Sequence, residues 1–138
     1  MFKLPLAALI TLLAACTPPP APARSCAGTG AEPAVTVQLF FGRNIKGGGG
    51  VSDADWKIFL AEAVTPRFPA GLTVLEASGQ WRQRSTGRII SERSTVVEIV
   101  TDAAPETIAK FDAIRTDYKL RFHQESVGFV VNESCASF

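Results

Sequence analysis

The order of hydrophobic periodicities along the chain is the feature that most constrains its fold. Apolar residues recur at every second position in segments 35–41 and 127–131, which is the period of a strand with one buried face. They recur at helical spacing in segments 56–64 and 108–122, and segment 72–101 is typical of a long hairpin. Two helices over one antiparallel four-stranded sheet in this order predict an α+β fold of the ferredoxin-like βαββαβ type, with both helices on one face and the last strand antiparallel to the first.

The limits of both helices are marked by capping residues and prolines. Ser52 and Asp55 form a capping box ahead of the first helix, and Pro66 is expected to end it because Thr65 must leave the helical region before a proline. Pro105 suits the first turn of the second helix. The expected apolar stripes comprise Trp56, Phe59, Leu60, Ala63 and Val64 in the first helix, and Ile108, Phe111, Ile114, Tyr118 and Phe122 in the second.

The turn of the hairpin decides which side chains share a face. A three-residue loop, Ser85 to Gly87, predicts that Leu75 lies opposite Val97, with Trp81 on the core side. The open face of the sheet, away from the helices, is then expected to carry the candidate ligand or interface residues Gln38, Phe40, Gln80, Arg82, Glu92 and Ser94. Plain solvation, packing against a second copy and a small-molecule site are three interpretations of this face.

The first sixteen residues predict export and lipid anchoring. Lys3 precedes a short apolar stretch, and the segment Leu13 to Cys16 resembles the lipobox of bacterial lipoproteins. The resemblance implies cleavage before Cys16, a lipid on its thiol, and a membrane partner at the bacterial cell envelope, on the extracytoplasmic side. We therefore expect a signal peptide over 1–15, a lipidated cysteine with a proline-rich spacer over 16–33, and a single α+β domain over 34–138.

Charge and cysteine content narrow the class of protein further. Without residues 1–15 the chain loses only Lys3 and balances 13 basic against 13 acidic residues, which argues against nucleic acid as a partner. Since the lipid uses Cys16, Cys26 and Cys135 remain as an even pair in an oxidising compartment. A structural disulfide is the favoured interpretation, over a redox pair or two metal ligands.

The sequence offers only weak evidence for a catalytic or ligand-binding site. Arg82, Arg84 and Arg88 near the hairpin tip suit contact with an anionic surface, although a solvated tip is the simpler interpretation. The glycine-rich segment 43–51 could cradle an anion but reads better as a flexible connection. His123 is expected to interact with a helix C-terminus rather than to act as an acid or base. We expect no catalytic residues, no metal and no cofactor.

Several segments together resemble one bacterial family. These are the run Leu39 to Gly42, the segment Thr65 to Leu75 (TPRFPAGLTVL), Gly79 to Arg82, and Tyr118 through Val127. The likeness is to the family of domain of unknown function 3574, and it spans nearly the whole chain after the signal segment. It implies secretion or lipid anchoring and a small globular domain, with no established activity or ligand.

The sequence thus favours a non-catalytic binding or interaction module, with a homodimer through the open sheet face as one form. The alternative is a cofactor-independent enzyme with Gln38, Arg82 and Glu92 around a pocket on that face. A pocket there with Arg82 and Glu92 converging would favour the enzyme.

Overall fold

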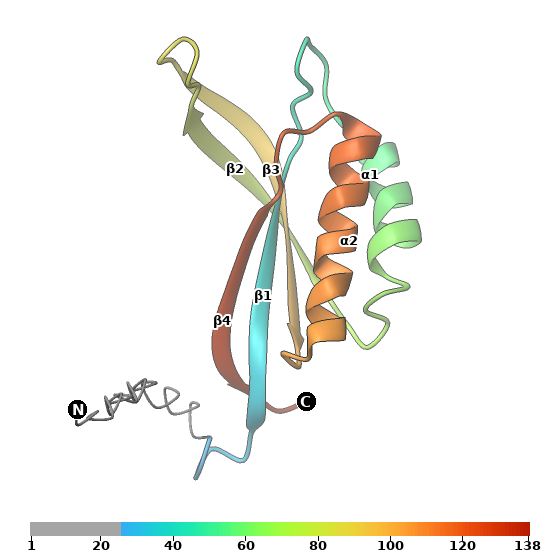
Figure 1. The fold of residues 1–138 in the computed structure, drawn as a ribbon, viewed down its shortest axis with the longest axis vertical. Helices are drawn as coiled ribbons and strands as arrows, with labels where there is room; N and C mark the ends of the chain where they lie inside the picture. The colour runs from blue at the N-terminus through green and yellow to red at the C-terminus, as the bar shows by residue number, and fades with distance from the viewer. Residues whose placement is uncertain (1–25) are drawn as a thin grey trace, which may run out of the picture.

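The computed structural model describes residues 26–138, so the predicted signal segment, Cys16 and most of the spacer lie outside the described residues. The elements in chain order are β1 (Glu32–Gly42), α1 (Asp53–Phe59), the π-helical turn η1 (Leu60–Val64), β2 (Thr73–Arg82), β3 (Ile89–Thr101), α2 (Pro105–Phe122) and β4 (Gly128–Ala136). One antiparallel sheet has the strand order β2-β3-β1-β4, and α1 and α2 lie side by side against one of its faces (Figure 1). The predicted ferredoxin-like fold is confirmed.

The core lies between the helices and β1. Val37, Leu39 and Phe41 point toward the helices and are fully buried, because the strand period places every second side chain on that face. From α2, Phe111, Ile114 and Tyr118 meet them with no exposed surface. An aromatic cluster fills one end of this core, with ring centroids 4.7 Å apart for Phe41 and Tyr118 and 5.0 Å apart for Phe59 and Tyr118.

The first helix begins as predicted but ends differently. The Ser52 hydroxyl accepts a hydrogen bond from the Asp55 backbone N–H at 3.1 Å. Thr65 stays helical, with φ −54° and ψ −42°, so the expectation that it leaves the helical region is wrong. Its N–H donates to the Leu60 carbonyl at 2.9 Å, and burial of Val64 and Phe68 on either side holds this wider π-type turn against the preference that a following proline imposes.

The hairpin register differs from the prediction by one residue. Val74, not Leu75, lies opposite Val97, and Leu75 lies opposite Val96. The loop has four residues rather than three, because the Gln83 N–H donates to the Arg88 carbonyl at 2.9 Å and Gly87 takes the left-handed conformation at φ +70°. A shift of one residue turns every side chain of β2 to the other face of the sheet.

A disulfide ties the two ends of the described chain together. Pro33 at the start of β1 lies opposite Cys135 at the end of β4, as the predicted antiparallel pairing requires. The Cys26 and Cys135 sulfur atoms lie at bonding distance, 2.00 Å apart. Residues 26–138 therefore contain one sheet, one closed core and this crosslink, and we expect this segment to fold on its own. No helix within it is long and apolar enough to cross a bilayer.

Replacing Cys26 and Cys135 together by serine should lower the free energy of unfolding of segment 26–138 by about 3 kcal/mol, because the crosslink closes a long loop in the unfolded chain. Thermal unfolding followed by circular dichroism, with and without a reductant, measures the loss. A reductant should destabilise the parent protein and leave the double-serine variant unchanged. Equal stability of the two proteins would show that the thiols are unpaired.

Candidate functional site

The face of the sheet that points away from the helices has no cover and carries an apolar row. Leu75, Val96 and Phe40 lie side by side on β2, β3 and β1, with relative exposures of 47%, 7% and 41%. On β4, Val130 lies beside Gln38 and is 41% exposed. We call Phe40, Leu75, Val96 and Val130 the apolar row. It has one member on each of the four strands; Leu75, Val96 and Phe40 are direct neighbours, and Val130 lies two positions along β4 from Gly128, which is opposite Phe40.

Polar side chains flank the apolar row and are bonded within the chain. The Gln38 side-chain amide donates to the Glu98 carboxylate at 2.8 Å, and the Thr36 hydroxyl donates to the Ser134 hydroxyl at 3.0 Å. Glu92 lies over Gly42, where a Cβ atom would come within 2.8 Å of its carboxylate oxygen. Glycine at position 42 therefore leaves the room in which the Glu92 side chain lies.

The predicted face residues divide between the two sides of the sheet. Gln38, Phe40, Glu92 and Ser94 lie on the open face, as expected. Gln80 and Arg82 were wrongly placed, because the one-residue longer loop turns them to the side of the helices, where Gln80 donates to the Ser91 hydroxyl at 3.2 Å. For the same reason Trp81 is not core but lies on the open face, 44% exposed. Arg82 and Glu92 do not converge.

Arg43 is the buried cation that sequence reasoning missed. It is 2% exposed; its Nε and Nη2 atoms donate to the Val51 carbonyl at 3.1 and 2.9 Å, and Nη1 donates to the Thr95 hydroxyl at 3.0 Å. Its guanidinium carbon lies 5.5 Å from the centroid of the Trp56 ring. The sequence did contain a signal for this burial. The alternation that buries the side chain at position 41 also directs the side chain at position 43 toward the core, although β1 ends at Gly42.

An ion-pair chain extends from Arg43 toward the open hairpin. Asp53 accepts from Arg43 at 3.0 Å and from Arg93 at 2.7 Å, and Arg93 also pairs with Glu76 at 2.8 Å. The hydrogen bond from Arg93, and then the one from Arg43, lowers the pKa of Asp53. Arg93 therefore belongs to the junction of β2, β3 and α1 and not to the hairpin tip.

The glycine-rich segment after Arg43 is a tight turn rather than a loose connection. Asn44 and Gly50 form an isolated bridge, and the Ile45 N–H donates to the Gly49 carbonyl at 3.1 Å. Gly47, Gly48 and Gly49 have φ values of 95°, 117° and 81°, which favour glycine. The segment projects beyond the sheet next to the start of α1 (Figure 1).

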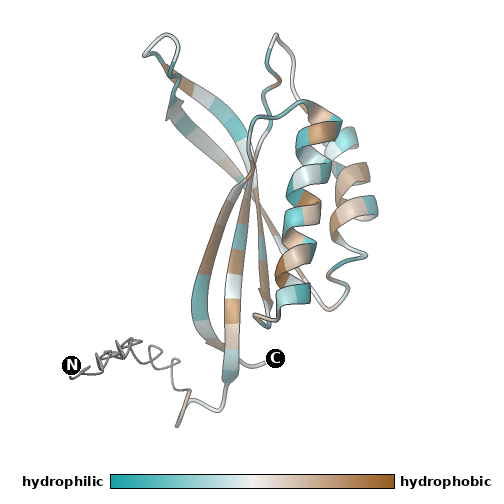
Figure 2. Cartoon of the chain, viewed as in Figure 1, coloured by the Kyte–Doolittle hydropathy of each residue, from teal (hydrophilic) through white to brown (hydrophobic). Residues whose placement is uncertain are grey.

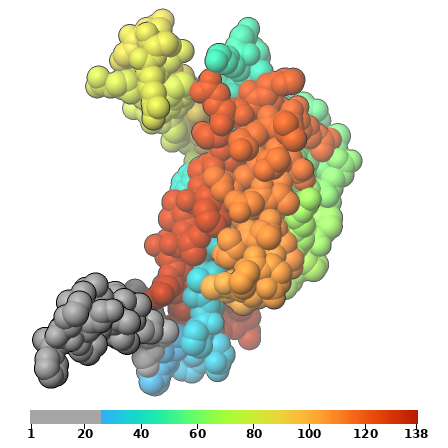
Figure 3. Space-filling model, viewed as in Figure 1, coloured from blue at the N-terminus to red at the C-terminus, as the bar shows by residue number. Residues whose placement is uncertain are grey.

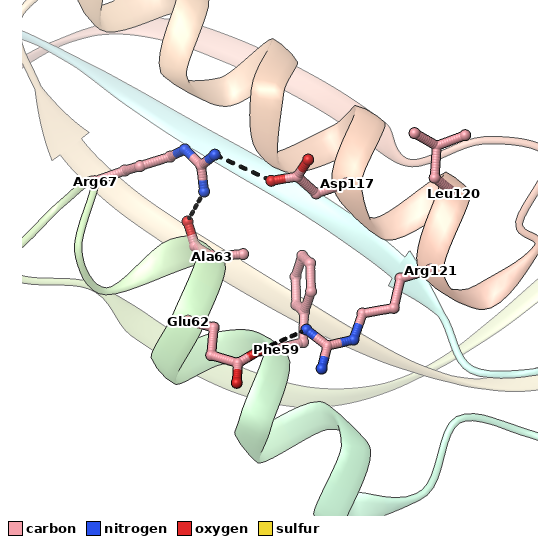
Figure 4. Close-up of a pocket in the computed structure, with 7 residues that line it drawn as sticks. All are labelled: Phe59, Glu62, Ala63, Arg67, Asp117, Leu120 and Arg121. Carbon is pink, nitrogen blue, oxygen red and sulfur yellow. Dashed lines mark hydrogen bonds and ion pairs between the residues drawn. The ribbon is translucent and has the colours of Figure 1, made fainter.

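A shallow groove of about 510 Å³ runs between the two helices on their outer side. Its two arginines point across it to acids on the opposite helical segment, Arg67 to Asp117 at 3.0 Å and Arg121 to Glu62 at 2.8 Å (Figure 4). Arg67 also donates to the Ala63 carbonyl at 2.6 Å. Because both guanidinium groups already have partners, the groove offers no free charge to a ligand.

The remaining candidates show no catalytic arrangement in the part of the chain that the structure describes. His123 caps the C-terminus of α2 in the left-handed conformation, at φ 51°, and is exposed. No three His, Cys, Asp or Glu side chains within residues 26–138 are grouped to hold a metal ion. Lipidation of Cys16 stays a prediction, since that residue lies outside the described chain.

The family model for proteins of unknown function, DUF3574, matches residues 36–138. The chain belongs to this family. The match confirms the resemblance seen in the sequence, and it spans the sheet, both helices and Cys135. No curated protein sequence matches the chain significantly.

Two solved structures share the fold of this DUF3574 chain. One is a phage SAM lyase in complex with S-methyl-5′-thioadenosine, at 18% identity and a TM-score of 0.57, covering 75% of this chain and 90% of that chain. The other is a phage SAM lyase in its apo state, at 20% identity and a TM-score of 0.56, covering 75% and 84%. At this level of identity the likeness concerns the fold.

Arg43→Met should lower the free energy of unfolding by about 3 kcal/mol, because the Val51 carbonyl and the Thr95 hydroxyl lose their buried donors. Arg121→Met removes the exposed pair with Glu62 and should cost less than about 1 kcal/mol. Urea unfolding of the two variants measures the difference. Similar losses would show that Arg43 contributes no more than a surface pair.

The single tyrosine gives a second test of the same region. Burial raises the pKa of Tyr118 to about 12, and its hydroxyl donates to the Gly42 carbonyl at 2.8 Å. Since the unfolded chain loses this proton at about pH 10, the contribution of Tyr118 to stability is complete below that pH and is lost as the pH rises toward 12. Absorbance at alkaline pH should show a late tyrosinate transition in the folded protein and an ordinary one in urea. An ordinary midpoint in both would contradict the buried environment.

Proposed function

We propose that this protein is a non-catalytic interaction module of the bacterial cell envelope, which forms a homodimer through the open face of its sheet. The uncovered apolar row carries the proposal, because a surface of this kind is costly to leave in water on a small domain. Export and a lipid on Cys16 are part of the same proposal and rest on the lipobox-like segment Leu13 to Cys16.

A second copy of the chain suits the shape of this face. The apolar row lies on a four-stranded sheet, and the face of a second sheet is one surface that packs well against such a face. A two-fold interface uses the same patch on both chains, so one apolar row supplies both sides. The resulting dimer would have helices on its two outer faces and a double sheet inside.

The neutral polar groups of the open face do not oppose this packing. The Gln38 amide donates to Glu98 and the Thr36 hydroxyl donates to Ser134, so these donors keep a partner when they are covered. The Glu98 carboxylate, by contrast, has no ion pair within residues 26–138 and has to keep contact with water at the edge of the interface. Glu92 lies toward the end of the sheet near the hairpin and accepts a long hydrogen bond from the Asn44 N–H, at 3.4 Å. It can remain at the rim, in water.

The structure does not bring together the residues that the enzyme alternative requires. It required Gln38, Arg82 and Glu92 around one pocket, but Arg82 lies on the opposite side of the sheet. Of the two grooves described, one lies between the helices and the other beside the start of β1, next to the turn between β3 and α2. The fold is shared with a phage enzyme, and the fold by itself brings no catalytic residue to this chain.

Leu75→Glu should convert a dimer of segment 26–138 into a monomer. Two copies of the charge would be buried at the interface, which should weaken association by at least about 100-fold. Light scattering after size-exclusion chromatography measures the mass, and circular dichroism confirms that the variant is folded. Leu120→Glu is the matched control, since Leu120 lies on the outer side of α2 with 72% exposure.

The parent protein and Leu120→Glu should have twice the mass of Leu75→Glu. A parent protein that is monomeric at high concentration would overturn the dimer. A dimer that persists in both variants would place the interface elsewhere on the molecule.

A further inference from the structure

The far end of the β2–β3 hairpin is a basic arm that stands apart from the rest of the molecule. We use this name for residues 80–91, the end of β2, the loop and the start of β3. In the space-filling view the arm is separated from the body and from the helices (Figure 3). It lies at the end of the sheet opposite to the Cys26–Cys135 disulfide (Figure 1).

The arginines of the arm differ from the others in having no acidic partner. Eight arginines lie within residues 26–138, and five of them pair with a carboxylate: Arg43, Arg67, Arg93, Arg115 and Arg121. The three without an ion pair are Arg82, Arg84 and Arg88, and all three are exposed. The structure therefore gathers its unpaired guanidinium groups on one projection.

The charge of the domain is polarised as a result. Residues 26–138 contain 12 basic and 13 acidic side chains, a nearly neutral sum. The arm holds three of the basic residues and none of the acidic ones, so its charge is +3 and that of the remaining body is −4. Such a field turns the arm toward an anionic surface and keeps the body away from it.

Exposed apolar side chains accompany the arginines. Trp81 is 44% exposed and Ile89 is 56% exposed, and they lie on opposite faces of the arm. Brown positions stand out between teal and white ones toward the end of the hairpin in Figure 2. A soluble polyanion would use only the arginines, whereas an indole and an aliphatic side chain beside basic groups suit the boundary between lipid headgroups and acyl chains.

We propose that the basic arm docks on a bilayer that contains anionic phospholipid. The three guanidinium groups bind headgroup phosphates, and Trp81 and Ile89 enter the interface beneath them. This contact is separate from the proposed lipid on Cys16, because it uses residues of the β2–β3 hairpin alone. It uses residues outside the apolar row, although Trp81 lies on the same face of the sheet.

Tryptophan fluorescence can report binding through the arm, because only one of the two tryptophans is exposed. Trp56 is 4% exposed in the core, and Trp81 is exposed on the arm, so a change in emission on binding reports Trp81. Segment 26–138, which lacks Cys16, is titrated with vesicles of phosphatidylcholine alone or mixed with an equal amount of phosphatidylglycerol. We expect binding and a blue shift with the mixed vesicles only, and loss of binding at high salt.

Two triple variants distinguish the effect of the charges on the arm from the effect of the overall charge of the domain. Replacing Arg82, Arg84 and Arg88 by glutamine should weaken partition onto the mixed vesicles on the order of 100-fold, about fivefold for each charge. Replacing Lys57, Lys110 and Lys119 on the helices by glutamine removes the same charge from the body and should change partition by no more than a few fold. Trp81→Phe should keep the binding and lose the blue shift.

Three results would overturn the proposal. They are equal partition of the two triple variants, equal binding to neutral and mixed vesicles, and binding without a blue shift of Trp81. Polyphosphate is added as a soluble competitor, and binding to it that is as tight as binding to mixed vesicles would assign the arm to a soluble polyanion instead. A monomeric protein that still binds through the arm would refute the dimer alone.

Discussion

The buried guanidinium of Arg43 holds the junction on which the rest of the domain depends. It lies where β1 ends and joins the Val51 carbonyl, the Thr95 hydroxyl and Asp53 at the start of α1. A charge at this depth is tolerated only because each direction of the guanidinium meets an acceptor. The glycine-rich turn is thereby folded back onto the sheet, and α1 begins where its aromatic side chains can reach those of β1 and α2.

The number of residues in one loop decides what the open face presents. With a four-residue loop, β2 places Leu75 and Trp81 on the open face and Gln80 and Arg82 on the other side. A three-residue loop would have given a polar face. The apolar character of the surface proposed for dimerisation, and the loss of the Arg82 and Glu92 pair proposed for catalysis, both follow from this difference.

The two proposed surfaces lie on different parts of the β2–β3 hairpin. Near the middle of the sheet, Leu75 and Val96 belong to the apolar row, with neighbours on all four strands. Over residues 80–91 the hairpin stands apart from the rest of the molecule, and its charged side chains there are all basic and accompany an exposed indole. A dimer through the apolar row would carry two arms, and they would strengthen attachment to one bilayer if the two-fold axis points both in the same direction.

The sequence alone determined the order of the elements, the starts of both helices, the buried face of β1 and the stripe of α2, because these follow from local periodicity and capping chemistry. It also indicated the family and favoured the pairing of Cys26 with Cys135, which the antiparallel pairing of β1 with β4 allows. Only the tertiary structure decided the register of β2, since hydrogen bonds across the loop between Gln83 and Arg88 outweigh a turn pattern. It alone showed that Arg43 is buried and that Arg82, Arg84 and Arg88 lack partners, because both facts depend on which acids and acceptors distant segments bring near.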